Sequence, residues 1–220
     1  MRAKDIMVFD LNTVSPGDTV ETVLLWMEES KLSQLPLVDE KGELQGLVFE
    51  EDLLAADPDL KIADLKVMRP VAYVKSSQHY YDVIKLLAET GLSMVPVITE
   101  EKEYLGAISL KEVIRALGGT ATMSEPGAVI VLEVRQRDYS LLQIANIVEG
   151  NDCKILSSYI TSYKESEFMD VTLKLNNSNI DGVLQTFSRY SYVVKESFQE
   201  SNYQDVLRRR YDELMNYINM

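Results

Sequence analysis

The sequence predicts an α+β protein made of a duplicated β-α-β-β-α unit, a second unit of the order β-α-β-β-α-β, and a final helix. Three observations support this prediction. A stretch of the first half occurs twice, a run of small residues interrupts the chain after it, and the apolar pattern changes beyond that break. A duplicated half followed by a half of different pattern indicates at least two structural units.

The repeat is the clearest signal in the chain. Residues 31–54 read KLSQLPLVDEKGELQGLVFEEDLL, and residues 91–114 read GLSMVPVITEEKEYLGAISLKEVI. Pro36 aligns with Pro96 without a gap, and each proline lies in a short apolar run that is followed by a charged turn and a second apolar run. Because proline favours extended backbone in the residue before it, each copy is predicted to be strand, turn, strand and helix.

A strand and a helix are also predicted ahead of each copy. Residues 12–14 and 72–74 are the strand candidates. The first helix is expected to begin with a capping box of Asp18 and Glu21, and the second helix with a cap at Ser76–Ser77. Apolar residues then follow at helical spacing in both copies, namely Val20, Val23, Leu24 and Met27, and Tyr80, Val83, Ile84 and Leu87.

Gly91 is well placed to end the second helix in a left-handed turn. The two units are therefore predicted to span residues 1–60 and 61–118, about 60 residues each. A lone core is marginal at that length, so we expect the two units to pack on each other.

The second half begins after a small and flexible linker, residues 119–127. Residues 128–134 form an unbroken apolar run, which predicts a strand buried on both faces. Residues 169–176 alternate apolar and polar, which predicts a strand exposed on one face. The order over residues 128–199 is the ferredoxin-like split arrangement, and the apolar stripe in residues 200–220 predicts a C-terminal helix.

Composition narrows the function. The net charge of −13 argues against a broad nucleic-acid-binding surface, and no apolar run reaches the length of a membrane span, about 18 residues. Cys153 is the only cysteine, so no intrachain disulfide can form and a reducing cytoplasm is the expected location. No catalytic or metal-ligand motif is found, and His79, the single histidine, has no partner motif, so we expect no enzyme activity, no catalytic residue and no metal site.

The residues of the repeat, LPLVDEKGELQGLV with FEEDLL and VPVITEEKEYLGAI with SLKEVI, resemble a tandem pair of CBS domains, also called a Bateman module. Residues 128–199 resemble an ACT domain by their order of strands and helices. The combination is similar to bacterial CBS–ACT proteins, some of them acetoin-utilisation-like. The resemblance implies a regulatory module without a required cofactor, whose two clefts bind adenosine nucleotides such as AMP, ADP or ATP.

The nucleotide signature of CBS pairs is a glycine, a Ser or Thr, and an Asp three residues later, where the last strand enters the last helix. A hydroxyl at a helix start suits a phosphate, and a carboxylate accepts ribose hydroxyls. The first copy has Asp52 but has Phe49 in the hydroxyl position, whereas the second copy has Ser109 and Lys111 with Glu112 in place of the Asp. The candidate nucleotide-binding residues are therefore Asp52, Ser109, Lys111 and Glu112. The alternatives are a simple capping box at Ser109 and Glu112, and a core or plugging role for Phe49.

The two copies are expected to differ in the ligand that they accept. Glu50 and Glu51 add negative charge where a phosphate would lie in the first copy, while Ser109 and Lys111 favour a phosphate in the second. A phosphorylated ligand is therefore predicted to use the second copy. At the Asp52 site, adenosine without phosphates should be disfavoured less than ATP or AMP.

The ACT resemblance implies an amino-acid site where the first strand turns into the first helix. Family members usually have a glycine there, and this chain has Ser140. The candidate residues are Asp138, Tyr139, Ser140 and Leu141, and pairing through sheet edges or helices is the alternative use of the domain.

These observations predict a non-catalytic regulator that senses an adenosine-type nucleotide and transmits the binding through a homodimer to an unknown protein partner. The apolar stripe within residues 203–218 is expected to contribute to that dimer, because it would be an unusual exposed patch on a monomer. Two alternatives remain, a scaffolding dimer with vestigial clefts and an amino-acid sensor that uses the ACT-like domain.

Overall fold

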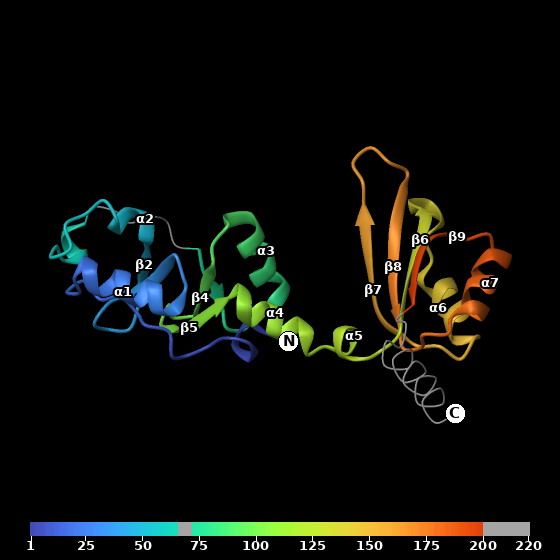
Figure 1. Ribbon diagram of the computed structural model, residues 1–220, viewed down its shortest axis with the longest axis horizontal. Helices are drawn as coiled ribbons and strands as arrows, with labels where there is room; N and C mark the ends of the chain where they lie inside the picture. Colours follow the sequence, from blue (N-terminus) through green and yellow to red (C-terminus); the bar gives the residue numbers. More distant parts are fainter. Residues whose placement is uncertain (66–71, 200–220) are drawn as a thin grey trace, which may run out of the picture. The chain divides into compact units, whose positions relative to one another are not determined.

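The computed structural model describes residues 1–65 and 72–199 (Figure 1). The chain divides into two compact units, Met1–Leu117 and Gly118–Met220. The predicted C-terminal helix of residues 200–220 lies outside the described residues.

Repeat 1 of the first unit contains two strands and two helices, α1 (Val20–Ser30), β1 (Gln34–Val38), β2 (Leu44–Phe49) and α2 (Glu50–Leu53). Strands β1 and β2 pair antiparallel. The predicted strand at residues 12–14 is reduced to a single parallel bridge between Val14 and Leu37. After α2 the chain forms a short 3-10 helix, η2 (Ile62–Asp64).

Repeat 2 is more regular, with β3 (Val74–Lys75), α3 (Tyr80–Thr90), β4 (Met94–Ile98), β5 (Tyr104–Ser109) and α4 (Leu110–Gly118). Its sheet has the order β3-β4-β5, with β3 parallel to β4 and β4 antiparallel to β5. The strand expected at residues 72–74 is displaced to Val74–Lys75. Gly91 ends α3 with a φ of 69°, which confirms the predicted left-handed turn.

Both predicted N-caps of these helices are wrong. The cap of α1 is Thr19, whose hydroxyl accepts the N–H of Thr22, because Asp18 is already used in the preceding turn, where it accepts the N–H of Ser15. The cap of α3 is His79 rather than Ser76–Ser77, because residues 75–78 form a turn before the helix begins. The turn residues thus displace each cap toward the C-terminus.

The N-terminal segment packs on repeat 2, although it precedes repeat 1 in the sequence. It begins with a short 3-10 helix, η1 (Ala3–Asp5), in which the N–H of Ala3 donates to the carbonyl of Gln78. Val8 then pairs antiparallel with Ala107. A Cβ at Gly106 would lie 2.3 Å from the carbonyl oxygen of Val8, so this crossing requires a glycine.

The two repeats pack on each other, and one buried polar residue joins them. Leu47 of repeat 1 lies in the core of repeat 2, and Leu32 contacts both cores. Gln34 is 2% exposed. In the orientation that satisfies both atoms of its amide, its oxygen accepts the N–H groups of Ser93 at 2.6 Å and Met94 at 3.2 Å.

The second unit contains α5 (Ala121–Ser124), β6 (Ala128–Arg135), η3 (Gln136–Asp138), α6 (Leu141–Glu149), β7 (Ile155–Ser162), β8 (Phe168–Leu175), α7 (Asp181–Arg189) and β9 (Val193–Gln199). Neighbouring strands are antiparallel in the order β7-β8-β6-β9, and α6 and α7 lie on one side of the sheet (Figure 1). The short helix α5 lies in the segment predicted to be a linker.

Burial in this sheet differs from the sequence-based expectation at two strands. Strand β6 alternates between buried and half-buried residues instead of being buried on both faces, because helices cover only one face. On β8, Asp170 and Thr172 were expected on the exposed side but are only 7% and 9% exposed. Lys195 and Tyr163 reach over Asp170 and bind its carboxylate, each at 2.7 Å.

No helix among the residues described in Figure 1 has the length and apolar character needed to cross a membrane.

Candidate functional site

Asp52, the acidic candidate of repeat 1, lines a cavity of about 370 Å³. The apolar wall of this cavity comes from β1, β2 and the segment after α2, and includes Leu37, Val48, Phe49 and Ile62. Phe49 is half-buried and also packs against the core of repeat 2, so it forms part of the wall as well as part of the packing. The cavity therefore combines an apolar surface with a carboxylate at one end of β2.

A second carboxylate of this cavity, Asp39, belongs to the turn between β1 and β2. It accepts the backbone N–H groups of Lys41 at 2.9 Å and Glu43 at 2.8 Å, and the side-chain amide of Gln45 at 2.8 Å. These bonds hold the turn and occupy the oxygens of Asp39. The cavity wall thus contains two carboxylates, that of Asp39 in the turn and that of Asp52 in α2.

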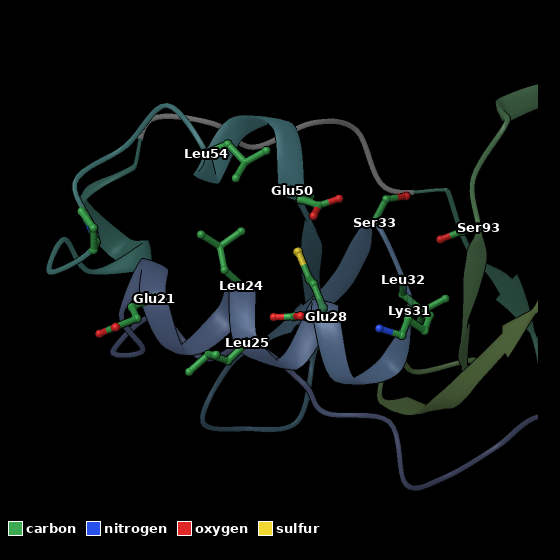
Figure 2. A pocket seen from close by; sticks show the side chains of 12 residues that line it. Glu21, Leu24, Leu25, Glu28, Lys31, Leu32, Ser33, Glu50, Leu54 and Ser93 are labelled. Atoms are coloured by element: carbon green, nitrogen blue, oxygen red, sulfur yellow. The ribbon is translucent and has the colours of Figure 1, made fainter.

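Glu50 lies on another side of α2 and lines a different cavity, a groove of about 750 Å³ between α1 and α2 (Figure 2). Residues two positions apart on a helix do not share a face, which explains why Glu50 and Asp52 separate. Glu50 therefore lines the groove and not the Asp52 cavity. The groove itself has Leu24, Leu25 and Leu54 among its apolar residues.

In repeat 2 the structure brings Ser109, Lys111 and Glu112 together at the start of α4. The N–H of Ser109 donates to the Glu112 carboxylate at 3.2 Å, and the Ser109 hydroxyl is hydrogen-bonded to the same carboxylate. The N–H of Lys111 donates to Oγ of Ser109 at 3.2 Å, and Arg115 lies 4.0 Å from Glu112. This is the capping box that the sequence offered as the alternative interpretation. The three residues line neither of the two cavities of repeat 1.

The four amino-acid-site candidates of the second unit do not converge. Ser140 caps α6 by accepting the N–H of Gln143 at 3.3 Å, and it lines a groove of about 700 Å³ that extends to α7. Asp138 lies 3.6 Å from the Arg137 guanidinium and lines a different cavity of about 330 Å³. Tyr139 packs against the core, and Leu141 is 47% exposed.

Two buried groups have shifted acidities without forming a site. Burial raises the pKa of the Cys153 thiol, which fits its position in the core of the second unit. Burial also raises the pKa of Tyr104, whose hydroxyl has no hydrogen-bond partner among the described residues. Across residues 1–65 and 72–199, no three His, Cys, Asp or Glu side chains are grouped to hold a metal ion.

Sequence reasoning missed part of the cavity around Asp52. Ile62 and Leu65 lie after α2, beyond the aligned repeat, and no motif marks them. Pro16 comes from the turn before α1. Only their apolar character points to burial, and that signal does not say which surface they line.

The sequence profile of the CBS domain matches the chain twice, over residues 3–59 and 62–119. The chain belongs to the CBS domain family. The Asp52 cavity and the Ser109 capping box thus occupy equivalent places in two CBS repeats, at the entry from the last strand into the last helix.

Relatives of this CBS protein match its first half. It is 31% identical over 126 residues to the magnesium transporter MgtE of Thermus thermophilus, a match that covers 54% of this chain and 28% of the transporter. It is 30% identical over 131 residues to the uncharacterized protein YlbB of Bacillus subtilis, with 54% of this chain and 88% of YlbB covered. The matched segment spans less than half the length of the transporter and of an inosine-5'-monophosphate dehydrogenase from Methanocaldococcus jannaschii, of which 23% is covered.

Solved structures give the same extent of similarity. A CBS domain pair/ACT domain protein from Thermotoga maritima is 28% identical, with 53% of this chain and 96% of that chain covered and a TM-score of 0.49. The cytosolic domain of the Mg²⁺ channel MgtE, solved in complex with ATP, is 30% identical, with 52% of this chain and 48% of that chain covered and a TM-score of 0.46.

Proposed function

We propose that this CBS protein is a non-catalytic regulator that binds an adenosine-type nucleotide in its CBS pair and transmits the binding through a homodimer. The observation that carries the proposal is the cavity of about 370 Å³ with Asp52 in its wall. Its volume is in the range of small-molecule sites, which begins near 300 Å³, and its lining combines apolar side chains with a few polar groups, as such sites do.

The chemistry of the cavity suits the base and ribose of a nucleoside. Leu37, Val48 and Ile62 offer apolar surface for a purine ring, and the Asp52 carboxylate is an acceptor for ribose hydroxyls. Glu50 faces the other side of α2, so its charge does not line this cavity. The phosphates would then extend toward the rim of the cleft rather than into its apolar wall.

In repeat 2, the Ser109 hydroxyl and the Lys111 ammonium are the groups that we assign to a phosphate. The backbone N–H groups at the start of α4 point in the direction that favours an anion. Binding there must compete with the hydrogen bonds between Ser109 and Glu112. A phosphate at this position therefore requires the Glu112 carboxylate to move.

We assign the second unit to an ACT-like domain. The support is its β-α-β-β-α-β order and its sheet order β7-β8-β6-β9. Because Ser140 and Asp138 line separate cavities and Tyr139 and Leu141 line neither of them, we assign the unit to the pairing of subunits rather than to amino-acid binding. The single buried cysteine agrees with a reducing, cytoplasmic location.

A thermal-shift panel on the full chain tests the nucleotide proposal. AMP, ADP, ATP and adenosine are each titrated, and a ligand at about 100 times its Kd should stabilise the folded protein by about 2.7 kcal/mol, which raises the melting temperature by several degrees. Asp52→Asn should reduce the shift, while Asp59→Asn, at an exposed position outside the cavity, should retain it. Ser109→Ala should reduce the shift by phosphorylated ligands more than the shift by adenosine.

The scaffolding alternative predicts a different result from the same panel. If no adenine compound at millimolar concentration moves the melting temperature, the clefts are vestigial and the nucleotide proposal is abandoned. A normal shift in Asp52→Asn together with a lost shift in Ser109→Ala would place the ligand in repeat 2 alone.

A further inference from the structure

Strand β7 is one edge of the sheet in the second unit, and no described strand pairs with its outer side (Figure 1). An edge strand presents a row of backbone N–H and C=O groups that can pair with another strand. The short helix α5 contacts β7, and the first three residues of the strand are half-buried. The last five residues, Ser158–Ser162, are exposed. We call these five residues the free edge.

The free edge lacks the features that usually protect an edge strand from pairing, which are charged side chains, proline and bulges. None of the eight residues of β7 is charged or a proline, although 26% of the residues of the chain are charged. Its one irregularity lies between Ile155 and Ser157, outside the free edge. The opposite edge strand, β9, carries Lys195 and Glu196. Of the two edges of this sheet, β7 is therefore the one suited to pairing.

An apolar side chain lies uncovered at the centre of the free edge. Ile160 pairs with Val171 of β8, so its side chain points to the side of the sheet that carries α6 and α7. Val171 is completely buried, whereas Ile160 is 44% exposed, because the core that α6 and α7 form with the sheet does not include Ile160. A further strand beside β7 would cover Ile160 and extend the apolar layer.

The absence of charge favours a second copy of this chain as that further strand. The net charge of −13 makes two copies repel each other through most of their surfaces. The free edge places no like charges opposite each other when it meets its own equivalent. Asp170 of β8 lies beside Thr161, but Lys195 and Tyr163 of the same chain already bind its carboxylate. A charged strand from another protein would find no counter-charge on the free edge.

We propose that β7 pairs antiparallel with β7 of a second copy, about a two-fold axis at Ile160. A two-fold axis makes the contacts reciprocal, so Ile160 lies opposite its own equivalent. Tyr159 then lies opposite Thr161 of the partner subunit, and Ser158 lies opposite Ser162 of the partner subunit. Aromatic and β-branched residues such as these are favoured in strands. The sheets of the two copies join into one continuous sheet.

This proposal rests on the proposed function and deepens it, because it identifies the surface through which the homodimer forms. Nucleotide binding is assigned to the CBS repeats and is measured separately by the thermal-shift panel. A missing shift together with intact β7 pairing would overturn the nucleotide proposal alone. A dimer that keeps the shift but does not pair through β7 would overturn the β7 proposal alone.

Disulfide cross-linking on the full chain tests the axis and the register. Opposite residues of an antiparallel pair have Cα atoms about 4.5–5.5 Å apart, within the range of a disulfide. Ile160→Cys, oxidised with copper phenanthroline, should therefore give a covalent dimer in denaturing electrophoresis. Ser158→Cys and Ser162→Cys are the matched controls, because each lies about 14 Å along the strands from its own equivalent. The native Cys153 is 2% exposed and gives the background reaction.

We expect neither Ser158→Cys nor Ser162→Cys to form a dimer alone, whereas an equilibrated mixture of the two should form one. Equal cross-linking of all three single variants would overturn the proposal, since it would reflect random collision. A mixture that gives no more dimer than its separate components would overturn the register.

A charge at the axis gives an independent test by sedimentation equilibrium. Ile160→Lys would bring two ammonium groups together, so self-association should weaken roughly tenfold or more. Val193→Lys is the matched control, because Val193 is 56% exposed on the other edge strand, β9, and the change in charge is the same. Equal weakening by both variants would overturn the proposal, because only the net charge would then matter.

Amide hydrogen exchange shows whether another part of the same chain covers the free edge instead. Protection of residues 158–162 should increase with protein concentration in the parent protein and should not do so in Ile160→Lys. Protection of the same amides in a monomeric protein at every concentration would overturn the proposal.

Discussion

The two CBS repeats share their hairpins and differ where the hairpins meet helices and neighbouring chain. Strands β1 and β2 pair in the same register as β4 and β5, and even the irregularity recurs, between Leu37 and Val38 and between Val97 and Ile98. In contrast, α2 has four residues and α4 has nine. The duplicated sequence pattern therefore reproduces the pairing of the strands in each hairpin but not the length of the helix that follows it.

The two helices begin at aligned positions, Glu50 and Leu110, but differ in the residue that precedes them. Ser109 and Glu112 satisfy backbone groups at the start of α4. Phe49 holds the equivalent position before α2, and its side chain makes no capping hydrogen bond. Phe49 instead packs against the core of repeat 2 and lines the Asp52 cavity. Repeat 1 thus has a cavity wall where repeat 2 has a helix cap.

The largest effect that we expect from this comparison concerns its two aligned glycines. Gly106→Ala would place a Cβ 2.3 Å from the Val8 carbonyl oxygen, whereas a Cβ at Gly46 meets no atom within 4 Å. Forcing an extra carbon into a packed site costs about 1–3 kcal/mol. Urea unfolding should therefore show a large loss for Gly106→Ala and little change for Gly46→Ala. Equal losses would show that the crossing of Val8 over Gly106 is not what separates the repeats.

The glycines also show what the sequence could and could not predict. The repeat, its hairpins and the apolar helix faces follow from local patterns, and the structure contains them. The crossing of Val8 over Gly106 joins residues far apart in the sequence, and no local pattern encodes such a contact. The expectation that Asp170 is exposed was wrong for the same reason, because its burial depends on Lys195, which lies two strands away in the sheet.

The candidate site was predictable to a similar extent. Asp52 was chosen from the family signature, and the structure places it in a cavity wall. The direction of Glu50 was not predictable, because the start of a four-residue helix fixes which side chain faces which cavity. The apolar wall from Ile62 lies outside the repeat and carries no motif.

An intermediate effect is expected at the cap of α4. Ser109→Ala removes the acceptor of the Lys111 N–H and should lower the free energy of unfolding by about 1 kcal/mol, the usual cost of a lost cap. Glu112→Gln keeps a side-chain oxygen for the Ser109 N–H and should cost less. Both are measured by urea unfolding without ligand. An unchanged stability in Ser109→Ala would indicate that the cap does not hold α4, and would leave the hydroxyl free for a ligand role.

The smallest expected effect comes from an ion pair of repeat 2, whose aligned positions in repeat 1 cannot form one. Lys75 donates to the Glu100 carboxylate, while the aligned residues of repeat 1 are Ser15 and Glu40. The hydrogen bond from Lys75 lowers the pKa of Glu100, and the same bond raises the pKa of Lys75. Both groups are exposed, so the pair should contribute little and should weaken in high salt.

The sign of this contribution can be checked by pH. A carboxylate whose pKa is lowered on folding stabilises the protein above its unfolded-state value, about 4.3, and loses that contribution as the pH falls through the folded-state pKa. Glu100→Gln should therefore melt slightly below the parent protein at pH 7, and the difference should vanish once the pH is below the lowered folded-state pKa of Glu100. Glu40→Gln, which removes the aligned carboxylate of repeat 1, should show no such pH-dependent difference. A deficit in Glu100→Gln that persists in acid would mean that the side chain acts through packing rather than through its charge.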